Sequence, residues 1–254
     1  MIPITVTVIA KNEEKNIGKT LAAVQGWAEE IIVVDSGSAD KTMDIAKTYG
    51  ATTLEHQWLG YGQQKNYAQS QAKNEWVLNL DADEVITSEL KEEISTVLKT
   101  ADSKNISGFA ISRRSYYVGK WIKNGGWFPS RVVRLAKKSS SKWSEPAVHE
   151  VLEVNGNVEN LNSPLDHFTF PTIESQILTN LRYAKQGSIQ LLKSNSSHGV
   201  FIMLMKAWWK FFNTYIFQLG FLDGKRGLII SINAAHSLFM KYAFTIETTE
   251  WNKK

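Results

Sequence analysis

The chain has 254 residues, enough for one large domain or one domain with an appendage, and its composition is that of a folded globular protein. It has no cysteine, which excludes thiol catalysis, disulfides and cysteine-ligated metals. The net charge of +4 is uneven, because residues 1–167 carry 19 basic and 21 acidic side chains, whereas residues 168–254 carry 10 and 4. A basic C-terminal part suits an anionic partner such as nucleic acid or a phospholipid headgroup layer.

The N-terminal sequence lacks the basic region and small-residue cleavage site of a signal peptide, so the sequence predicts a cytoplasmic protein. Residues 3–10 form the first expected strand, and apolar residues at helical spacing follow it. The polar connector between them contains Asn12 and Glu13. In an open α/β sheet this position lies at the ligand-binding edge, although an ordinary polar loop explains it equally well.

Residues 31–35 predict a second buried strand ending in Asp35, a carboxylate placed to accept hydrogen bonds from a ribose or a base. Asp40 in the following turn is expected to cap a helix that ends near Gly50. A short strand near 52–54 and a helix from about 60 to 73 come next. Lys65 in that helix is placed for a diphosphate, although a surface lysine is the simpler interpretation.

The segment 76–85, WVLNLDADEV, predicts a buried strand that opens onto the carboxylates of Asp81, Asp83 and Glu84. Alternation points Asp81 and Asp83 the same way, so one divalent ion could meet both. A strand followed only by a helix cap at residues 87–89 is the alternative. Strands alternating with helices predict a mostly parallel, Rossmann-like α/β sheet with helices on both sides. Neither a GxGxxG nor a P-loop motif is present.

From residue 109 an extended segment leads into an aromatic, glycine-rich loop over 119–129, which could hold a sugar face on Trp121 and Trp127. Arg131 and Arg134 could grip phosphate or carboxylate groups, so these two arginines and two tryptophans are candidates for binding the acceptor. Packing beneath a loop is the alternative for the aromatic residues. Residues 147–151 predict a strand in which His149 and Glu150 face opposite ways. His167 is a further titratable candidate.

The segment 201–222 predicts one helix with a narrow polar stripe and an extensive aromatic surface. Lysines at its centre argue against a membrane-spanning helix, and a helix lying in the membrane interface fits better, with a role in the core or a dimer as the alternative. A final helix is expected over 229–244. The residues expected to meet the membrane are Lys206, Trp208, Trp209, Lys210 and Phe212.

These motifs in this order (NEE, VVDSGSADKT, GYGQQKNYA, LNLDADE, WIKNGGW, VHE and GFLDGKRG) resemble family-two glycosyltransferases, most closely the lipopolysaccharide inner-core beta-glucosyltransferase branch. The resemblance covers nearly the whole chain. It implies a GT-A fold in residues 1–167, with residues 168–254 as a helical, amphipathic extension for membrane or acceptor docking. It also implies an inverting hexosyl transfer, of glucose or another hexose, from a UDP-sugar to a lipid-linked or lipopolysaccharide-core saccharide.

The resemblance further implies roles for individual residues. The nucleoside would be framed by Ala10, Asn12, Glu13 and Asp35, with Lys65 and Asp81 near the nucleotide. Mg²⁺ or Mn²⁺ would be held by Asp83, with Asp81 and His167 as further candidate ligands. Glu150 would be the catalytic base, and His149 is the alternative because relatives commonly have Glu-Asp where this chain has His-Glu.

The expected partners are therefore the donor, a saccharide acceptor and the inner face of an anionic cytoplasmic membrane, with a homo-oligomer as an open option and no nucleic acid. Two other classes of protein stay open at this point. A sugar nucleotidyltransferase would share the sheet and the acidic site, but its glycine- and arginine-rich first loop is missing here. A membrane-associated scaffold that binds nucleotide sugars would need neither a base nor a metal.

Overall fold

The computed structural model describes residues 1–145, 150–193 and 199–251. The chain divides into two compact units, the first formed by Met1–Arg114 with Ser130–Phe168 and the second by Ser115–Pro129 with Thr169–Lys254. The sequence-based division at residue 167 placed 115–129 in the first unit. These residues belong to the second because Tyr117 and Ile122, both fully buried, pack against Ile230 of the C-terminal helix.

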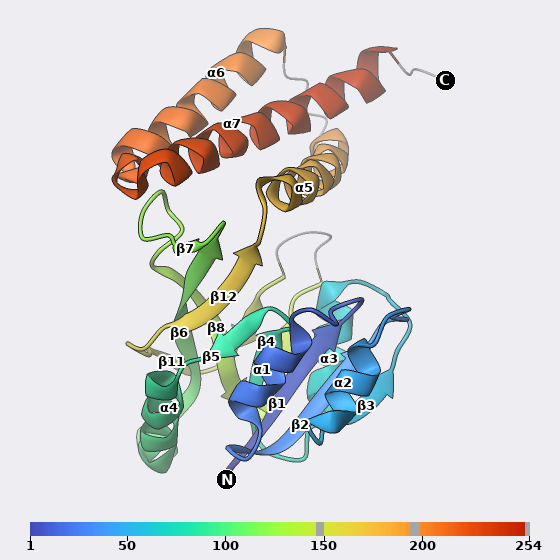
Figure 1. Cartoon of the computed structure of the whole chain (residues 1–254), viewed down its shortest axis with the longest axis vertical. Helices are drawn as coiled ribbons and strands as arrows, with labels where there is room; N and C mark the ends of the chain where they lie inside the picture. Colours follow the sequence, from blue (N-terminus) through green and yellow to red (C-terminus); the bar gives the residue numbers. More distant parts are fainter. Residues whose placement is uncertain (146–149, 194–198, 252–254) are drawn as a thin grey trace. The chain divides into compact units, whose positions relative to one another are not determined.

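The first unit is built on a sheet whose N-terminal half is parallel, as the alternation of strands and helices predicts (Figure 1). Its order begins β3-β2-β1-β4, and every neighbouring pair runs in the same direction. The strands are β1 (Ile2–Ala10), β2 (Ala28–Asp35), β3 (Thr52–Glu55) and β4 (Trp76–Asp81). The carboxyl ends of β1, β2 and β4 therefore meet at one edge, since Ala10 pairs with Asp35 and Ile9 with Asp81.

The other half of the sheet continues beyond β4 in the order β8-β6-β12-β5, and here antiparallel pairs join β4 to β8, β8 to β6, and β12 to β5. The sheet is mixed, where the sequence pattern predicted a mostly parallel one. The strands are β5 (Glu84–Ile86), β6 (Ile106–Tyr117), β8 (Ser130–Lys137), β11 (Asn157–Asn160), which pairs with β6, and β12 (Leu165–Phe170).

A separate two-stranded ribbon is formed by β9 (Ser141–Trp143) and β10 (Leu152–Val154), and a short 3-10 turn, Lys138–Ser140, precedes it. The strand predicted over 147–151 differs from this arrangement. Glu150 and Val151 lie just before β10 and outside any strand, although the Ser144 N–H donates to the Val151 carbonyl at 2.9 Å. Residues 147–149 lie outside the described part of the chain.

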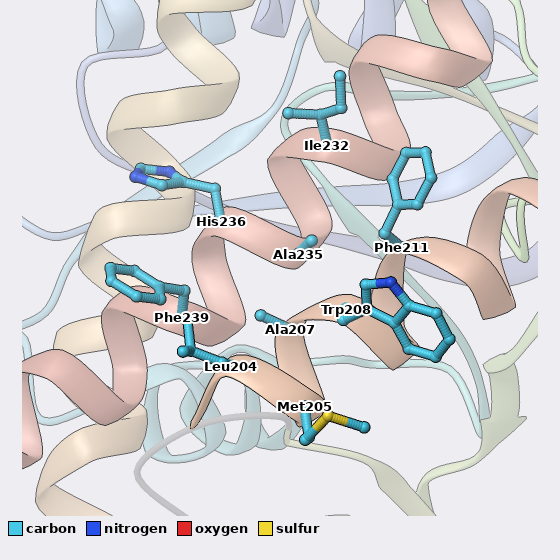
Figure 2. Close-up of a pocket in the computed structure, with 9 residues that line it drawn as sticks. All are labelled: Leu204, Met205, Ala207, Trp208, Phe211, Ile232, Ala235, His236 and Phe239. Carbon is cyan, nitrogen blue, oxygen red and sulfur yellow. The ribbon is translucent and has the colours of Figure 1, made fainter. Parts of the chain in front are cut away.

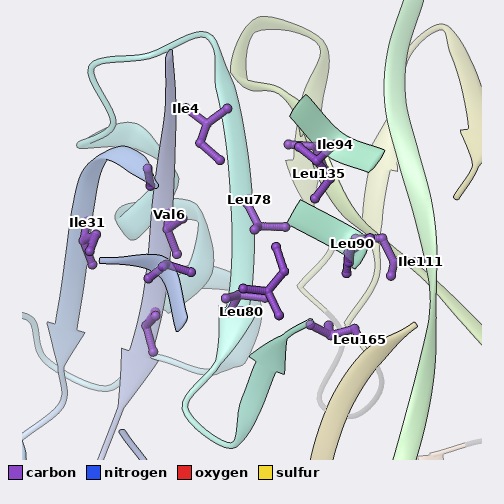
Figure 3. Close-up of a cluster of buried hydrophobic side chains, with 14 of the residues drawn as sticks. Ile4, Val6, Ile31, Leu78, Leu80, Leu90, Ile94, Ile111, Leu135 and Leu165 are labelled. Atoms are coloured by element: carbon purple, nitrogen blue, oxygen red, sulfur yellow. The ribbon is translucent and has the colours of Figure 1, made fainter. Parts of the chain in front are cut away.

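Helices cover both faces of the parallel half, and alternation along β2 determines which side chains each face buries. Ile31 and Val33 join the main core with α1 (Ile17–Val24), α2 (Thr42–Thr48) and α4 (Ser88–Ala101) (Figure 3). Ile32 and Val34 pack on the opposite face against Ala68 of α3 (Tyr61–Ser70). The predicted start of α4 is confirmed, since Thr87 Oγ1 accepts the Leu90 N–H at 3.2 Å.

The second unit contains the short strand β7 and three long helices. They are β7 (Lys120–Trp121), α5 (Ile173–Lys193), α6 (Val200–Phe212) and α7 (Gly224–Ile246), which ends in a π turn, Glu247–Trp251. The single helix predicted over 201–222 is interrupted. It ends at Phe212, widens into a π turn over Asn213–Phe217 and is followed by a 3-10 turn over Gly220–Asp223, because Leu219 takes a left-handed φ of 58°.

No helix within the described residues combines the length and the apolar character that crossing a bilayer requires.

Candidate active site

The first loop of the site connects β1 to α1 and is fastened to the turn that follows β2. Asn12 has a left-handed φ of 55°, and its N–H donates to Ser38 Oγ at 2.8 Å. Its side-chain Oδ1 accepts the Ala39 N–H at 2.9 Å, and the Glu13 N–H donates to Thr42 Oγ1 at 2.8 Å. Two loops far apart in sequence therefore form one rim beside the last residue of β1, Ala10.

Asp35 lies at the end of β2 and is only 3% exposed. Its Oδ2 accepts the N–H groups of Gly37 and Ser38 at 2.8 and 2.7 Å, and its Oδ1 accepts the Ser38 hydroxyl. Both oxygens thus hold the turn. A contact between Asp35 and a nucleoside stays a prediction, and it would use the lone pairs that these bonds leave available.

Lys65 is the centre of the charged cluster. The sequence allowed a surface lysine, but this residue is only 5% exposed. Its ammonium lies 2.9 Å from Asp81 Oδ1 and 2.8 Å from Glu150 Oε1, and 4.5 Å from the ring centroid of Trp143. A buried lysine needs such partners, because an ammonium group without them would lose its hydration uncompensated. Three segments therefore meet at one cation: α3, the end of β4 and the chain before β10.

A buried pair beneath this cluster fixes Asp81. Arg134 of β8 donates to the second oxygen of Asp81 and, at 2.6 Å, to Oε1 of Glu84. Glu84 is fully buried, and its Oε2 accepts the Asp81 N–H at 3.0 Å. Arg134 is itself 4% exposed, so in this structure it orients carboxylates within the unit. The acceptor contact predicted for it stays untested.

Asp83 has a different partner from Asp81. Its Oδ2 lies 3.3 Å from His167 Nε2, and 27% of its side chain is exposed. Backbone contacts position the turn that carries it: the Phe168 N–H donates to the Asp83 carbonyl at 2.9 Å, and Thr20 Oγ1 donates to the Ala82 carbonyl at 2.7 Å. Asp83 is therefore a partly exposed carboxylate beside an imidazole.

The ionisation of these groups follows from their neighbours. Burial alone would raise the pKa of Asp81, but Arg134 and Lys65 hold it well below its usual range. Burial would likewise lower the pKa of His167, yet its contact with Asp83 and the charge of Glu84 raise it. Burial raises the pKa of Glu13, and the nearby charges of Asp83 and Asp81 add to this effect against a hydrogen bond from Asn16. Negative potential is thus concentrated where the exposed carboxylate lies.

The remaining predicted residues lie elsewhere. Trp121 and Trp127 belong to the second unit, where Trp127 packs against Tyr117 and Phe170, as the packing alternative expected. Arg131 is exposed on β8, and its Nη1 donates to the Leu161 carbonyl at 3.1 Å. His149 lies outside the described residues, so the choice between it and Glu150 as base stays open.

Sequence reasoning did not single out two important contributors. Trp143 supports Lys65 with its ring and donates its Nε1 hydrogen to Asn79 Oδ1 at 3.2 Å, but no spacing in the sequence marks this residue. Glu84 was recognised only as part of an acidic run. Its position at the start of an apolar strand could have indicated that Glu84 is buried. A buried carboxylate needs a cation, so this position would also have predicted a basic partner.

Comparison with known proteins gives three consistent findings. The profile described as "Glycosyl transferase family 2" matches residues 5–150. An uncharacterized glycosyltransferase of Rickettsia typhi is 29% identical over 96% of this chain and 86% of its own length. The lipopolysaccharide core biosynthesis glycosyltransferase LpsC of Rhizobium meliloti is 26% identical over 95% of this chain and 94% of its own.

Among solved structures, TarS of S. aureus superposes with a TM-score of 0.50 and 17% identity. The match covers 97% of this chain and 55% of that one. At this identity the likeness concerns the fold alone, and it agrees with the GT-A architecture that the sequence predicted.

Proposed function

Because the chain belongs to glycosyl transferase family 2, we propose that it moves a hexosyl group, glucose or another hexose, from a UDP-sugar to a hydroxyl of a saccharide acceptor, with inversion. The observation that carries the proposal is the cluster at the end of β4, where Lys65 joins Asp81 to Glu150 at 2.9 and 2.8 Å. The cluster combines a cation for phosphate with a carboxylate for a proton.

Lys65 is the residue that would meet the donor diphosphate. Its ammonium is held by two carboxylates. A phosphate oxygen is also an anionic hydrogen-bond acceptor, so it can compete with these carboxylates for the ammonium. Arg134 fixes Asp81 from below, whereas Lys65 is the one charged partner of Glu150 within the described residues. Glu150 is therefore the partner that a diphosphate would displace from Lys65.

Once displaced, Glu150 would act as general base. Its carboxylate would take the proton of the acceptor hydroxyl while that oxygen attacks the anomeric carbon. The bond from the anomeric carbon to the diphosphate oxygen breaks with both electrons going to the nucleoside diphosphate. Attack opposite the leaving group inverts the configuration at the anomeric carbon.

The distance between Asp83 and His167 is compatible with a bound divalent cation. Asp83 Oδ2 and His167 Nε2 are 3.3 Å apart, close to the roughly 3 Å that separates neighbouring ligands of an octahedral ion with bonds of about 2.1 Å. Within the described residues no group of three or more histidine or acidic side chains is placed to hold a metal by itself, so diphosphate oxygens and water would complete the shell. Both oxygens of Asp81 already contact cations. Mg²⁺ or Mn²⁺ held by Asp83 and His167 would neutralise charge on the leaving diphosphate.

The acceptor is proposed to be a lipid-linked or lipopolysaccharide-core saccharide. The support is the relative LpsC, whose name places it in lipopolysaccharide core biosynthesis and which matches nearly the whole chain. The identity of 26% supports this acceptor class without defining the linkage.

The test is to incubate the protein with UDP-glucose, Mn²⁺ and a truncated lipopolysaccharide core, and to measure UDP release and the mass of the acceptor. Glu150→Gln should reduce turnover by on the order of 10²–10⁴, the usual size of a general-base contribution, with little change in UDP binding. Glu153→Gln, an exposed glutamate of β10, is the matched control and should retain full turnover. Pyrophosphate exchange in place of UDP release would identify a nucleotidyltransferase. An unchanged rate for Glu150→Gln would assign the base to another residue.

A further inference from the structure

The helix α6 exposes large apolar side chains that a helix on a water-exposed surface usually buries. Met203 is its one buried residue, whereas Trp208 and Trp209 are 54% and 56% exposed and Phe201 is 75% exposed. Lys206 turns toward α7, where its Nζ donates to the Tyr242 hydroxyl at 2.8 Å. One lysine of the polar stripe thus contacts α7, while large aromatic side chains of α6 remain exposed.

The uncovered surface continues past the end of α6. The next exposed apolar side chains belong to the turns that follow it, with Phe217 65% exposed and Leu222 60% exposed. Ile232 extends the surface onto α7 and is 50% exposed. A patch formed by two helices and the turns between them is larger than the scattered apolar residues found on ordinary protein surfaces.

An open groove runs within this patch between α6 and α7 (Figure 2). Its volume is about 700 Å³, and its walls are aliphatic and aromatic: Leu204, Trp208 and Phe211 on α6 face Ile232, Ala235 and Phe239 on α7. Among the lining residues His236 is the one with an ionisable side chain. Such a groove has few hydrogen-bonding groups for a polar ligand, so it suits a hydrocarbon chain.

The charges around the patch are mostly basic. The described stretch 199–251 has five lysine and arginine side chains against three acidic ones, Asp223, Glu247 and Glu250. Asp223 is 6% exposed because its carboxylate accepts the N–H groups of Lys123 and Asn124. Lys210, Lys225 and Lys241 lie in the same stretch. Two copies of this chain joined through the patch would bring like charges together, whereas an anionic lipid surface complements them.

We propose that this patch inserts into the headgroup and acyl boundary of an anionic phospholipid bilayer, with the groove between α6 and α7 taking an acyl chain. Helices that lie in this boundary place aromatic and aliphatic side chains below the headgroups and basic side chains among them. This inference goes beyond the transfer reaction and does not depend on it, since membrane binding needs neither donor nor acceptor.

The first test is sedimentation of the full chain with vesicles of phosphatidylglycerol and phosphatidylcholine. Replacing Trp208 and Trp209 together with serine should weaken binding at least about tenfold, because both rings are more than half exposed. The matched control replaces two exposed apolar residues outside the patch, Val158 and Ile173, with serine and should bind as the wild type does. Changing Lys210 and Lys225 to glutamine should cost about fivefold per residue at low salt and less at high salt.

The second test uses the absence of native cysteine, which allows a single label at a chosen site. An environment-sensitive dye on Leu204→Cys or Phe217→Cys should shift to the blue with anionic vesicles and be quenched by brominated acyl chains, while the dye on Val158→Cys should not respond. Melting curves identify any variant that fails to fold. Failure of the wild type to bind vesicles would overturn the proposal, as would a concentration-dependent dimer in solution that the double tryptophan variant abolishes.

Discussion

Replacing Arg134 with methionine removes the cation between two carboxylates without leaving a large void. Glu84 is fully buried and would keep, among the described residues, Arg113 at 3.6 Å and the Asp81 N–H as its close partners. Removal of one partner from a buried ion pair costs about 3–5 kcal/mol, because the other charge stays buried and uncompensated. We expect the free energy of unfolding to fall by that amount near neutral pH.

The measurement is urea unfolding followed by circular dichroism, with Arg131→Met as control. Arg131 lies on the same strand but is exposed and makes one hydrogen bond to a carbonyl, so its loss should cost about 0.5–1.5 kcal/mol.

The lowered pKa of Asp81 also predicts a pH dependence. The contribution of Asp81 to the stability of the wild type is present above its unfolded pKa, near 3.8, and is lost as the pH falls below that value. Without Arg134 the buried carboxylates should take up protons at higher pH, which removes the uncompensated charge. The difference in unfolding free energy between the wild type and Arg134→Met should therefore become smaller as the pH is lowered from about 7 to about 4. Equal stability of the two variants at neutral pH would refute the buried-pair argument.

Two further substitutions test the metal assignment and the packing of the site. Asp83→Asn should reduce Mn²⁺-dependent turnover by on the order of 10² or more while the melting temperature stays unchanged, because an amide is a poorer ligand for a hard cation; wild-type turnover would remove Asp83 from the metal site. Gly62→Ala should destabilise by roughly 1–3 kcal/mol in the same urea assay, because a Cβ there would lie 2.1 Å from the carbonyl oxygen of Ser144. Gly18→Ala is its control, with the nearest neighbour at 3.5 Å, and equal effects of the two changes would contradict the packing argument.

The parallel half of the sheet could be predicted because its signal is local. β1, β2 and β4 are buried apolar runs, and helices alternate with the strands along this part of the chain, so sequence order indicates most of the topology. The antiparallel half gave no such signal. Its pairs, such as β6 with β8 and β5 with β12, join segments separated by loops of irregular length, and only tertiary contacts select the partner strand.

The sequence could predict which types of residue form the site, but not which side chains contact one another. Spacing indicated carboxylates at the end of β4 and a lysine in α3, and the structure brings Lys65, Asp81 and Glu150 together. Arg134 was expected to bind an acceptor, and its burial could not be predicted from sequence, because it depends on carboxylates 50 residues or more away in the chain. The same limit applies to α6, whose amphipathic pattern does not reveal which face meets α7.

The charges of the site also explain why a buried lysine suits a transferase. Lys65 is stabilised by Asp81 and Glu150, so its ammonium charge is compensated without substrates. A diphosphate can replace a carboxylate at Lys65 without leaving the ammonium unpaired, because one anion is exchanged for another. In the proposed mechanism the exchange would also free Glu150, and a carboxylate that is no longer paired with a cation is a stronger base. Donor binding would thus prepare the base before the acceptor hydroxyl needs it, which is the order that transfer to an acceptor requires.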